Sequence, residues 1–145
     1  MPNYAQSQYR IENPEKYVGN KVPYYKSSWE YSFCRFCDTN ESILKWAYEA
    51  VKIPYKNPFT GKYTVYVPDF FISYVDKNGK QHNELIEVKP RNQTSIAEAK
   101  NNKLNRARAV LNEAKWQAAK TWAKQNNIVF RVITENDMFG VGKRR

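Results

Sequence analysis

Residues 67–89 have the sequence VPDFFISYVDKNGKQHNELIEVK, and this stretch decides the fold. Two runs rich in apolar and β-branched residues, 70–75 and 81–89, flank the polar segment 76–80, which contains Asn-Gly. Alternating apolar runs on either side of such a segment predict a β-hairpin. Acidic residues stand near both outer ends of the hairpin, so its register determines whether they meet.

The connection between the two runs has two common lengths. A two-residue loop at residues 78–79 would place Asp69 opposite Val88, with the acidic side chains on opposite faces. A three-residue loop uses a type I turn that starts at Asp76, followed by a left-handed Gly79 and a bulge. Asp suits the first position of that turn and Gly the last, so the sequence favours the three-residue loop.

In the favoured register Asp69 lies opposite Glu87, and strand alternation puts Lys89 on the same face as Glu87. Directly opposed residues have Cβ atoms roughly 5 Å apart. Two carboxylates so placed repel unless a cation neutralises them, and hard oxygen ligands suit Mg²⁺. A solvated strand face is the other interpretation of Glu87 and Lys89. A bulge at Pro68 would reset the faces, because proline cannot donate to a ladder.

A third acidic residue, Glu30, opens a segment with helical spacing of apolar residues, predicted over 28–39. Ser27 and Glu30 have the spacing of a capping box, which explains Glu30 without catalysis. From the sequence alone the capping role is favoured, although capping and catalysis are not exclusive.

These residues carry a family resemblance. Glu30 on the first helix, then Pro68-Asp69, then Glu87-Val88-Lys89 before a further helix and strand resemble the PD-(D/E)XK nuclease superfamily, in its TnsA-like branch. More specifically, the chain resembles the head-completion nucleases of T-even-type tailed phages, in residues 3–10, 24–30, 67–71 and 130–133. The resemblance implies an α/β restriction-endonuclease-like core, Mg²⁺-dependent DNA cleavage and a role at the phage head late in virion assembly. It places Glu30, Asp69, Glu87 and Lys89 at catalytic positions.

The predicted chemistry follows from this set. Asp69, Glu87 and the backbone carbonyl of Val88 are expected to hold Mg²⁺, for which Mn²⁺ can substitute. Glu30 is expected to bind a second ion or a bridging water. Lys89 is expected to orient the nucleophile or to stabilise charge on the phosphate oxygens. Expected partners are DNA and phage head, portal or neck proteins, in the cytoplasm of the infected bacterial host or in the virion head.

The charge of the chain independently favours a polyanionic partner. Its 145 residues, the size of one ordinary domain, carry a net charge of +10. Residues 27–90 have eight basic and eight acidic side chains, whereas residues 91–145 have twelve basic and four acidic ones. DNA attracted by the basic part would be delivered to the acidic site. The candidate DNA contacts are Lys26, Arg91, Lys100, Lys103 and Arg106.

Other functions stay open at this point. Lysines that merely solvate a long helix would also give a basic chain. A structural protein of the phage head or neck could bind DNA without cutting it, and no residue excludes RNA as the substrate. No apolar stretch is long enough to span a membrane and no apolar signal segment follows Met1, so a cytoplasmic product is expected.

The remaining patterns complete a predicted single domain, residues 1–145, with a mixed sheet of about four strands and helices on both faces. A second helix is predicted over 41–51, and a short helix after Pro90 that Thr94 or Ser95 could cap. The other predicted elements are an aromatic N-terminal arm over 1–25, a strand over 52–56, one bent strand over 63–75, a helix over 103–125, a strand over 128–133 and a mobile basic tail over 140–145.

Three further expectations concern side chains. Two stripes are expected to be buried on the long helix, one from Leu104 to Trp122 and a second that includes Trp116. Cys34 and Cys37 are expected to be buried thiols, because a zinc site needs about four ligands. His82 is expected across from Tyr74, on the opposite face from Glu87 and in a structural role.

Overall fold

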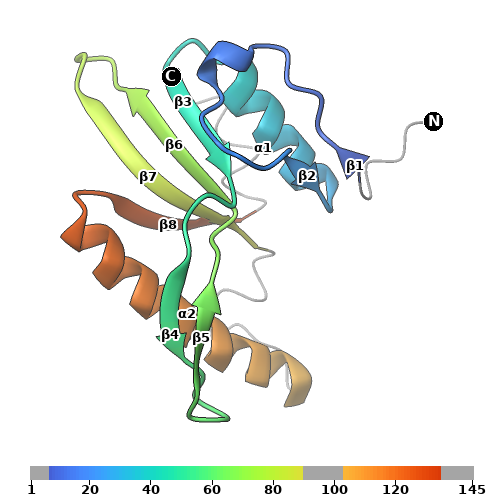
Figure 1. Cartoon of the computed structure of the whole chain (residues 1–145), viewed down its shortest axis with the longest axis vertical. Coiled ribbons are helices and arrows are strands. Elements are labelled where there is room, and N and C mark those ends of the chain that lie inside the picture. Colours follow the sequence, from blue (N-terminus) through green and yellow to red (C-terminus); the bar gives the residue numbers. More distant parts are fainter. Residues whose placement is uncertain (1–6, 90–102, 135–145) are drawn as a thin grey trace.

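The centre of the molecule is a four-stranded mixed sheet with a helix on each face (Figure 1). The structure is a computed structural model that describes residues 7–89 and 103–134. In spatial order the strands are β3 (Ile43–Tyr48), β6 (Phe70–Val75), β7 (Gln81–Val88) and β8 (Val129–Ile133). Helix α1 (Ser28–Thr39) packs on one face and helix α2 (Lys103–Gln125) on the other. The predicted α/β fold class is therefore confirmed. No helix in either described part of the chain is long and apolar enough to cross a membrane.

The β6–β7 hairpin has the register that the three-residue loop predicts. The backbone N–H of Gly79 donates to the Asp76 carbonyl at 2.9 Å, and Gly79 has φ +81°. The Asp76 carboxylate accepts from the backbone N–H groups of Asn78 and Lys80, at 2.9 Å each, which holds the turn closed. Beyond the turn Phe71 pairs with Leu85. Every residue of β6 is therefore placed on the predicted face.

Neighbouring residues of β7 divide the core into two clusters on opposite faces of the sheet. Ile86 packs with α1, whereas Leu85 packs with α2. This alternation is what a strand buried on both sides requires. Glu87 shares a face with Leu85 and therefore faces the α2 layer.

The helix predicted over 41–51 is wrong, because this segment forms β3, antiparallel to β6. The register shifts between Ile43 and Lys45, so Leu44 is an extra residue in the ladder. The buried side chains of β3 are those of Ile43, Trp46, Ala47 and Tyr48, so after the bulge the burial resumes three and four residues beyond Ile43. A strand with one bulge can thus imitate the period of an amphipathic helix.

The single bent strand predicted over 63–75 is instead two strands in different sheets. Residues Tyr63–Tyr66 form β5, which pairs with β4 (Ile53–Lys56) in a separate two-stranded ribbon that lies beside α2 (Figure 1). The ladder stops between β5 and β6 at Pro68, which has no N–H to donate. The predicted bend at residues 68–69 is therefore a crossing from one sheet to the other.

Helix α2 ends at the predicted Gln125 and is already helical at its first described residue, Lys103, but the two stripes on it are not equally buried. Its fully buried side chains are those of Ala109, Asn112, Trp116, Ala119 and Ala123. Leu104, at the start of the other stripe, is 59 % exposed, and the later members of that stripe are only partly buried. After α2 the chain enters β8, which runs parallel to β7 with Leu85 beside Phe130.

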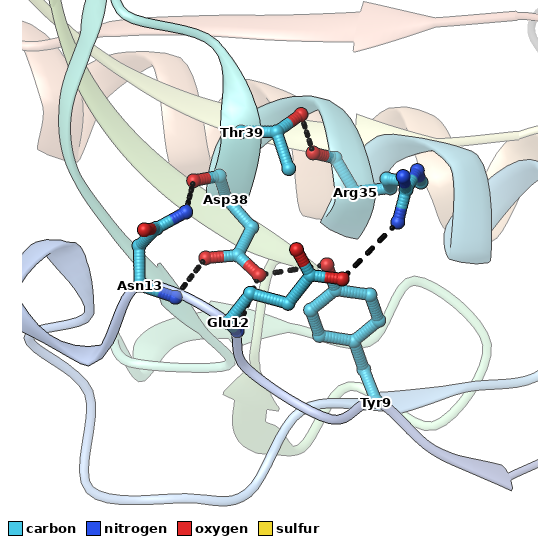
Figure 2. A network of polar contacts seen from close by, with 6 residues as sticks. All are labelled: Tyr9, Glu12, Asn13, Arg35, Asp38 and Thr39. Atoms are coloured by element: carbon cyan, nitrogen blue, oxygen red, sulfur yellow. Dashed lines mark hydrogen bonds and ion pairs between the residues drawn. The ribbon is translucent and has the colours of Figure 1, made fainter.

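The described part of the N-terminal arm is fastened to the C-terminal end of α1 by Asp38 (Figure 2). This fully buried carboxylate accepts from the Tyr9 hydroxyl at 2.8 Å, the Glu12 N–H at 2.7 Å and the Asn13 N–H at 3.0 Å. The Asn13 side chain returns a bond to the Asp38 carbonyl at 2.8 Å. Tyr9 also lies in the core cluster of α1, so the arm packs as part of the domain.

Strands β1 (Ser7–Gln8) and β2 (Tyr24–Tyr25) close the arm into an antiparallel loop, with the 3₁₀ helix Pro14–Lys16 between them. The strand β2 leads directly into α1, whose first turn contains Glu30. Fixing the arm therefore also fixes the start of α1.

The expectations for the thiols and for the histidine are confirmed. Cys34 and Cys37 are buried and unpaired, and burial raises the pKa of both thiols. His82 stacks on Tyr74, with ring centroids 5.0 Å apart, and its Nε2 lies 2.8 Å from the Asp76 carboxylate. The short helix predicted after Pro90 and the basic tail over 140–145 lie outside the described residues.

Candidate active site

Asp69 is held at the junction of three segments. Its backbone carbonyl accepts a hydrogen bond from the Glu49 N–H at 2.9 Å, and its Oδ2 accepts from the Val88 N–H at 2.8 Å. Glu49 follows β3 with a left-handed φ of +48°, which turns the chain away where it meets Asp69. The side chain of Asp69 is therefore drawn toward the end of β7 by a backbone donor.

Glu87 lies opposite Asp69, as the register predicts. Its side chain is nearly buried, at 6 % exposure. The Tyr66 hydroxyl donates to Glu87 Oε1 at 2.7 Å, and Lys89 Nζ lies 3.6 Å from Glu87 Oε2. The backbone of Lys89 is fixed by β8, because its N–H donates to the carbonyl of Ile133 at 3.0 Å. The structure therefore brings Asp69, Glu87 and Lys89 together.

The two carboxyl groups are short of positive charge. The pKa of Asp69 is raised well above its usual value, first by burial and then by the repulsion of Glu87, with Glu30 adding to it. Burial also raises the pKa of Glu87, against the Tyr66 hydroxyl and Lys89, which lower it. Because the pKa of both buried acids stays raised although Lys89 is near both and Lys115 is near Glu87, an additional cation would stabilise both charged forms.

Glu30 forms the helix cap that the sequence favours, and its carboxylate also lies near the acidic pair. Its N–H donates to the Ser27 Oγ at 3.1 Å, so Ser27 is the N-cap of α1, and its carboxylate accepts from the Lys26 N–H at 2.6 Å. The return bond reaches one residue further back than in the usual capping box. The same carboxylate raises the pKa of Asp69 and of Tyr48, so it lies near the acidic pair as well as in the cap.

Two residues that the sequence did not single out complete the surroundings. Tyr66 is buried beneath the α2 layer, and Lys115 of α2 has its Nζ 5.8 Å from the Tyr66 ring centroid. Burial lowers the pKa of Lys115, as does Lys89, whereas Glu87 raises it. Tyr66 could have been found from its place three residues before Asp69. Lys115 could not, because only the packing of α2 shows which of its lysines faces the sheet.

The donor set suits a hard divalent cation with retained waters. Among residues 7–89 and 103–134, no three His, Cys, Asp or Glu side chains are grouped closely enough to hold a metal ion. Mg²⁺ in proteins is usually held by one or two carboxylates, with waters and substrate phosphates as the other ligands. The opposed carboxylates of Asp69 and Glu87 fit that requirement.

The DNA contacts predicted from the sequence are only partly described. Lys26, Lys103 and Arg106 are exposed, the first beside Ser27 and the other two at the start of α2. Arg91 and Lys100 lie outside the described residues.

Comparison with known proteins decides the family. The model of the TnsA-like endonuclease N-terminal domain matches residues 40–135, which include Asp69, Glu87, Lys89 and Lys115. This chain belongs to the TnsA-like endonuclease family. The chain is also similar to the head completion nuclease of Enterobacteria phage T4, with 31 % identity over 141 residues, covering 90 % of this chain and 91 % of that protein. The predicted family resemblance is thus confirmed, and the fold of a TnsA-like endonuclease accounts for the mixed sheet.

Proposed function

We propose that this protein is a divalent-metal-dependent endonuclease that hydrolyses phosphodiester bonds of DNA during completion of a phage head. The observation that carries the proposal is the pair of opposed carboxylates, Asp69 and Glu87, with Lys89 in contact with Glu87. The membership in an endonuclease family supports hydrolysis, and the similar T4 protein supports the role in head completion.

The proposed ligands are the carboxylates of Asp69 and Glu87 and the backbone carbonyl of Val88, holding Mg²⁺ or Mn²⁺. When bound, such an ion polarises a phosphate oxygen and lowers the pKa of a water. Glu30 takes a bridging water or a second ion, because one of its oxygens is occupied by the Lys26 N–H. The Val88 N–H keeps the Asp69 carboxylate in place before any ligand arrives.

Lys89 acts as a cation at the scissile phosphate. Its ammonium is close to Glu87, so it stabilises the carboxylate when DNA is absent and negative charge on the phosphate when DNA is bound. Its place beside Glu87 suits Lys89 to orienting the attacking water. Tyr66 holds Glu87 in one orientation through its 2.7 Å hydrogen bond.

The substrate and partners follow from the charge and from the relative. Lys26, Arg91, Lys100, Lys103 and Arg106 are proposed to contact phosphates of DNA. The proposed protein partners are components of the phage head, portal or neck, met in the cytoplasm of the infected bacterial host or in the virion head. Sequence-independent contacts of this kind weaken as salt increases.

A plasmid assay tests the proposal. The parent chain is incubated with supercoiled DNA in Mg²⁺, in Mn²⁺ and in EDTA, beside Lys89→Ala and a matched control, Lys80→Ala. Lys80 is an exposed lysine in the turn of the same hairpin, at the end away from Asp69. We expect nicking by the parent and by Lys80→Ala only with metal, and a loss of about 10²–10³-fold in Lys89→Ala.

Three outcomes would contradict the proposal. Equal nicking by Lys89→Ala and the parent would identify a contaminant as the source of the activity. If the parent chain binds the plasmid but does not nick it, the structural head or neck protein would be favoured. Faster digestion of RNA than of DNA in a parallel reaction would change the substrate.

A further inference from the structure

The ribbon of β4 and β5 is a basic element without an acidic residue. Between residues 51 and 68 the chain has Lys52, Lys56 and Lys62 and neither Asp nor Glu. All three lysines are exposed, and within the described residues none of their ammonium groups is engaged in an ion pair. The even balance of charge over residues 27–90 conceals this local excess of positive charge.

The two faces of the ribbon differ. Its inner side chains, Ile53, Tyr55 and Tyr66, are buried against α2. On its outer face Lys56 pairs with Tyr63, and Pro54 pairs with Val65. The inner face therefore anchors the ribbon, and the outer face is unused by the fold.

Large apolar groups stand on this basic surface. Tyr63 is 77 % exposed, Val65 is 50 % exposed, and Phe59 in the connecting turn is 60 % exposed. The turn that presents Phe59 is well defined, since the Asn57 side chain accepts from the N–H groups of Phe59 at 2.8 Å and of Thr60 at 3.2 Å. Exposed aromatic residues held on a rigid element and flanked by lysines are suited to a partner that offers both negative charge and apolar contacts.

The ribbon is continuous with the candidate active site. Its last residue, Tyr66, bonds to Glu87, and Asp69 follows three residues later. At about 3.3 Å per residue, Tyr63 lies at most ~20 Å from Asp69, the length of about six base pairs. A polyanion held at the carboxylate pair could therefore extend along the ribbon.

We propose that the outer face of the β4–β5 ribbon binds duplex DNA beside the scissile bond, with its lysines on phosphates and with Phe59 and Tyr63 in a groove. A two-stranded ribbon is narrow enough to enter the major groove. An acidic protein surface is the competing occupant, but it does not offer a groove of matching width with phosphates along both edges. The position relative to the cut rests on the proposed function, whereas the binding of DNA does not.

Binding without cleavage tests the inference. The dissociation constant for a fluorescently labelled 20-base-pair duplex is measured by anisotropy in EDTA at several salt concentrations. Lys52→Ala/Lys56→Ala and Phe59→Ala/Tyr63→Ala are compared with the parent and with the control Lys77→Ala/Lys80→Ala. The control removes the same charge from an exposed turn at the far end of the sheet. Thermal melting verifies that each variant is folded.

We expect the lysine variant to bind ~10-fold more weakly or worse, with the slope of log K against log salt reduced by about 1.8. The aromatic variant should lose ~10-fold with an unchanged slope, because apolar contacts in the groove release no counterions. The control should bind within about 2-fold of the parent. Ribbon variants that bind like the control would overturn the inference, even if the parent cuts plasmid. If the ribbon variants lose binding while the parent binds but never cuts, the nuclease is refuted and the ribbon remains a DNA-binding element.

Discussion

Replacing Asp69 by Asn should make the protein more stable in EDTA while abolishing cleavage. Residues opposed across a hairpin have Cβ atoms roughly 5 Å apart, and we take this as the separation of the two charges. At an effective dielectric constant of about 20, their mutual repulsion is about 3 kcal/mol when both are charged. The Asn side chain can still accept the Val88 N–H, but a neutral acceptor gives up about 1 kcal/mol. The expected net gain is about 2 kcal/mol, or roughly 6 °C in Tm.

The dependence on pH gives the sign of the effect. Both acids have a pKa raised on folding, by burial and, for Asp69, by the charge of Glu87. Stability from such groups is fully present below the ordinary carboxyl pKa of about 4 and is lost as the pH rises. The difference in Tm between Asp69→Asn and the parent should therefore be largest near pH 8 and should shrink as the pH falls toward 4.

Asp38→Asn is the matched control, because it also removes one buried carboxylate. Asp38 accepts three hydrogen bonds, from Tyr9, Glu12 and Asn13. An amide has one oxygen for these donors, so at least one is left without an acceptor, at a cost of about 1–3 kcal/mol. Thermal melting should show a lower Tm for Asp38→Asn and a higher one for Asp69→Asn. A lower Tm for Asp69→Asn at pH 8, or an equal difference at both pH values, would refute the reasoning.

Three further predictions concern activity. Glu30→Gln should keep the hydrogen bond from the Lys26 N–H, and therefore the Tm of the parent. Its rate of plasmid nicking should fall about 10²-fold. Nicking at the parent rate would restrict Glu30 to the helix cap. Lys115→Ala should lower the cleavage rate by ~10-fold, because it removes a cation beside Glu87, whereas the exposed Lys120→Ala should cut like the parent. Tyr66→Phe removes a donor that lowers the pKa of Glu87, so the acid limb of the pH–rate profile should move to higher pH; an unmoved limb would contradict this.

Local chemistry made part of the fold predictable. The cap at Ser27 and the turn from Asp76 to Gly79 are set by neighbouring residues, so α1 and the β6–β7 register follow from sequence. The register in turn predicts that Asp69 and Glu87 meet. The position of Glu30 near them follows only from the family resemblance, since its cap explains it locally.

Other features depend on contacts that no local pattern encodes. The bulge at Leu44 gives β3 a helical spacing, and only its pairing with β6 shows that it is a strand. The residues on both sides of Pro68 have strand character, so the sequence does not show that they belong to different sheets. That change of sheet is set by how β4 and β5 pack on α2. For the same reason Lys115 could not be assigned to the site from its sequence position.

The parallel pairing of β7 with β8 affects when this protein becomes active during synthesis. Lys89 is fixed through the Ile133 carbonyl, and Arg131 of β8 bonds to Glu84 at 2.9 Å. When Glu30, Asp69, Glu87 and Lys89 have all left the ribosome, β8 is still missing. Lys89 then lacks the strand that fixes its backbone. During translation, Lys89 can therefore be secured beside the carboxylate pair only after α2 and then β8 have left the ribosome.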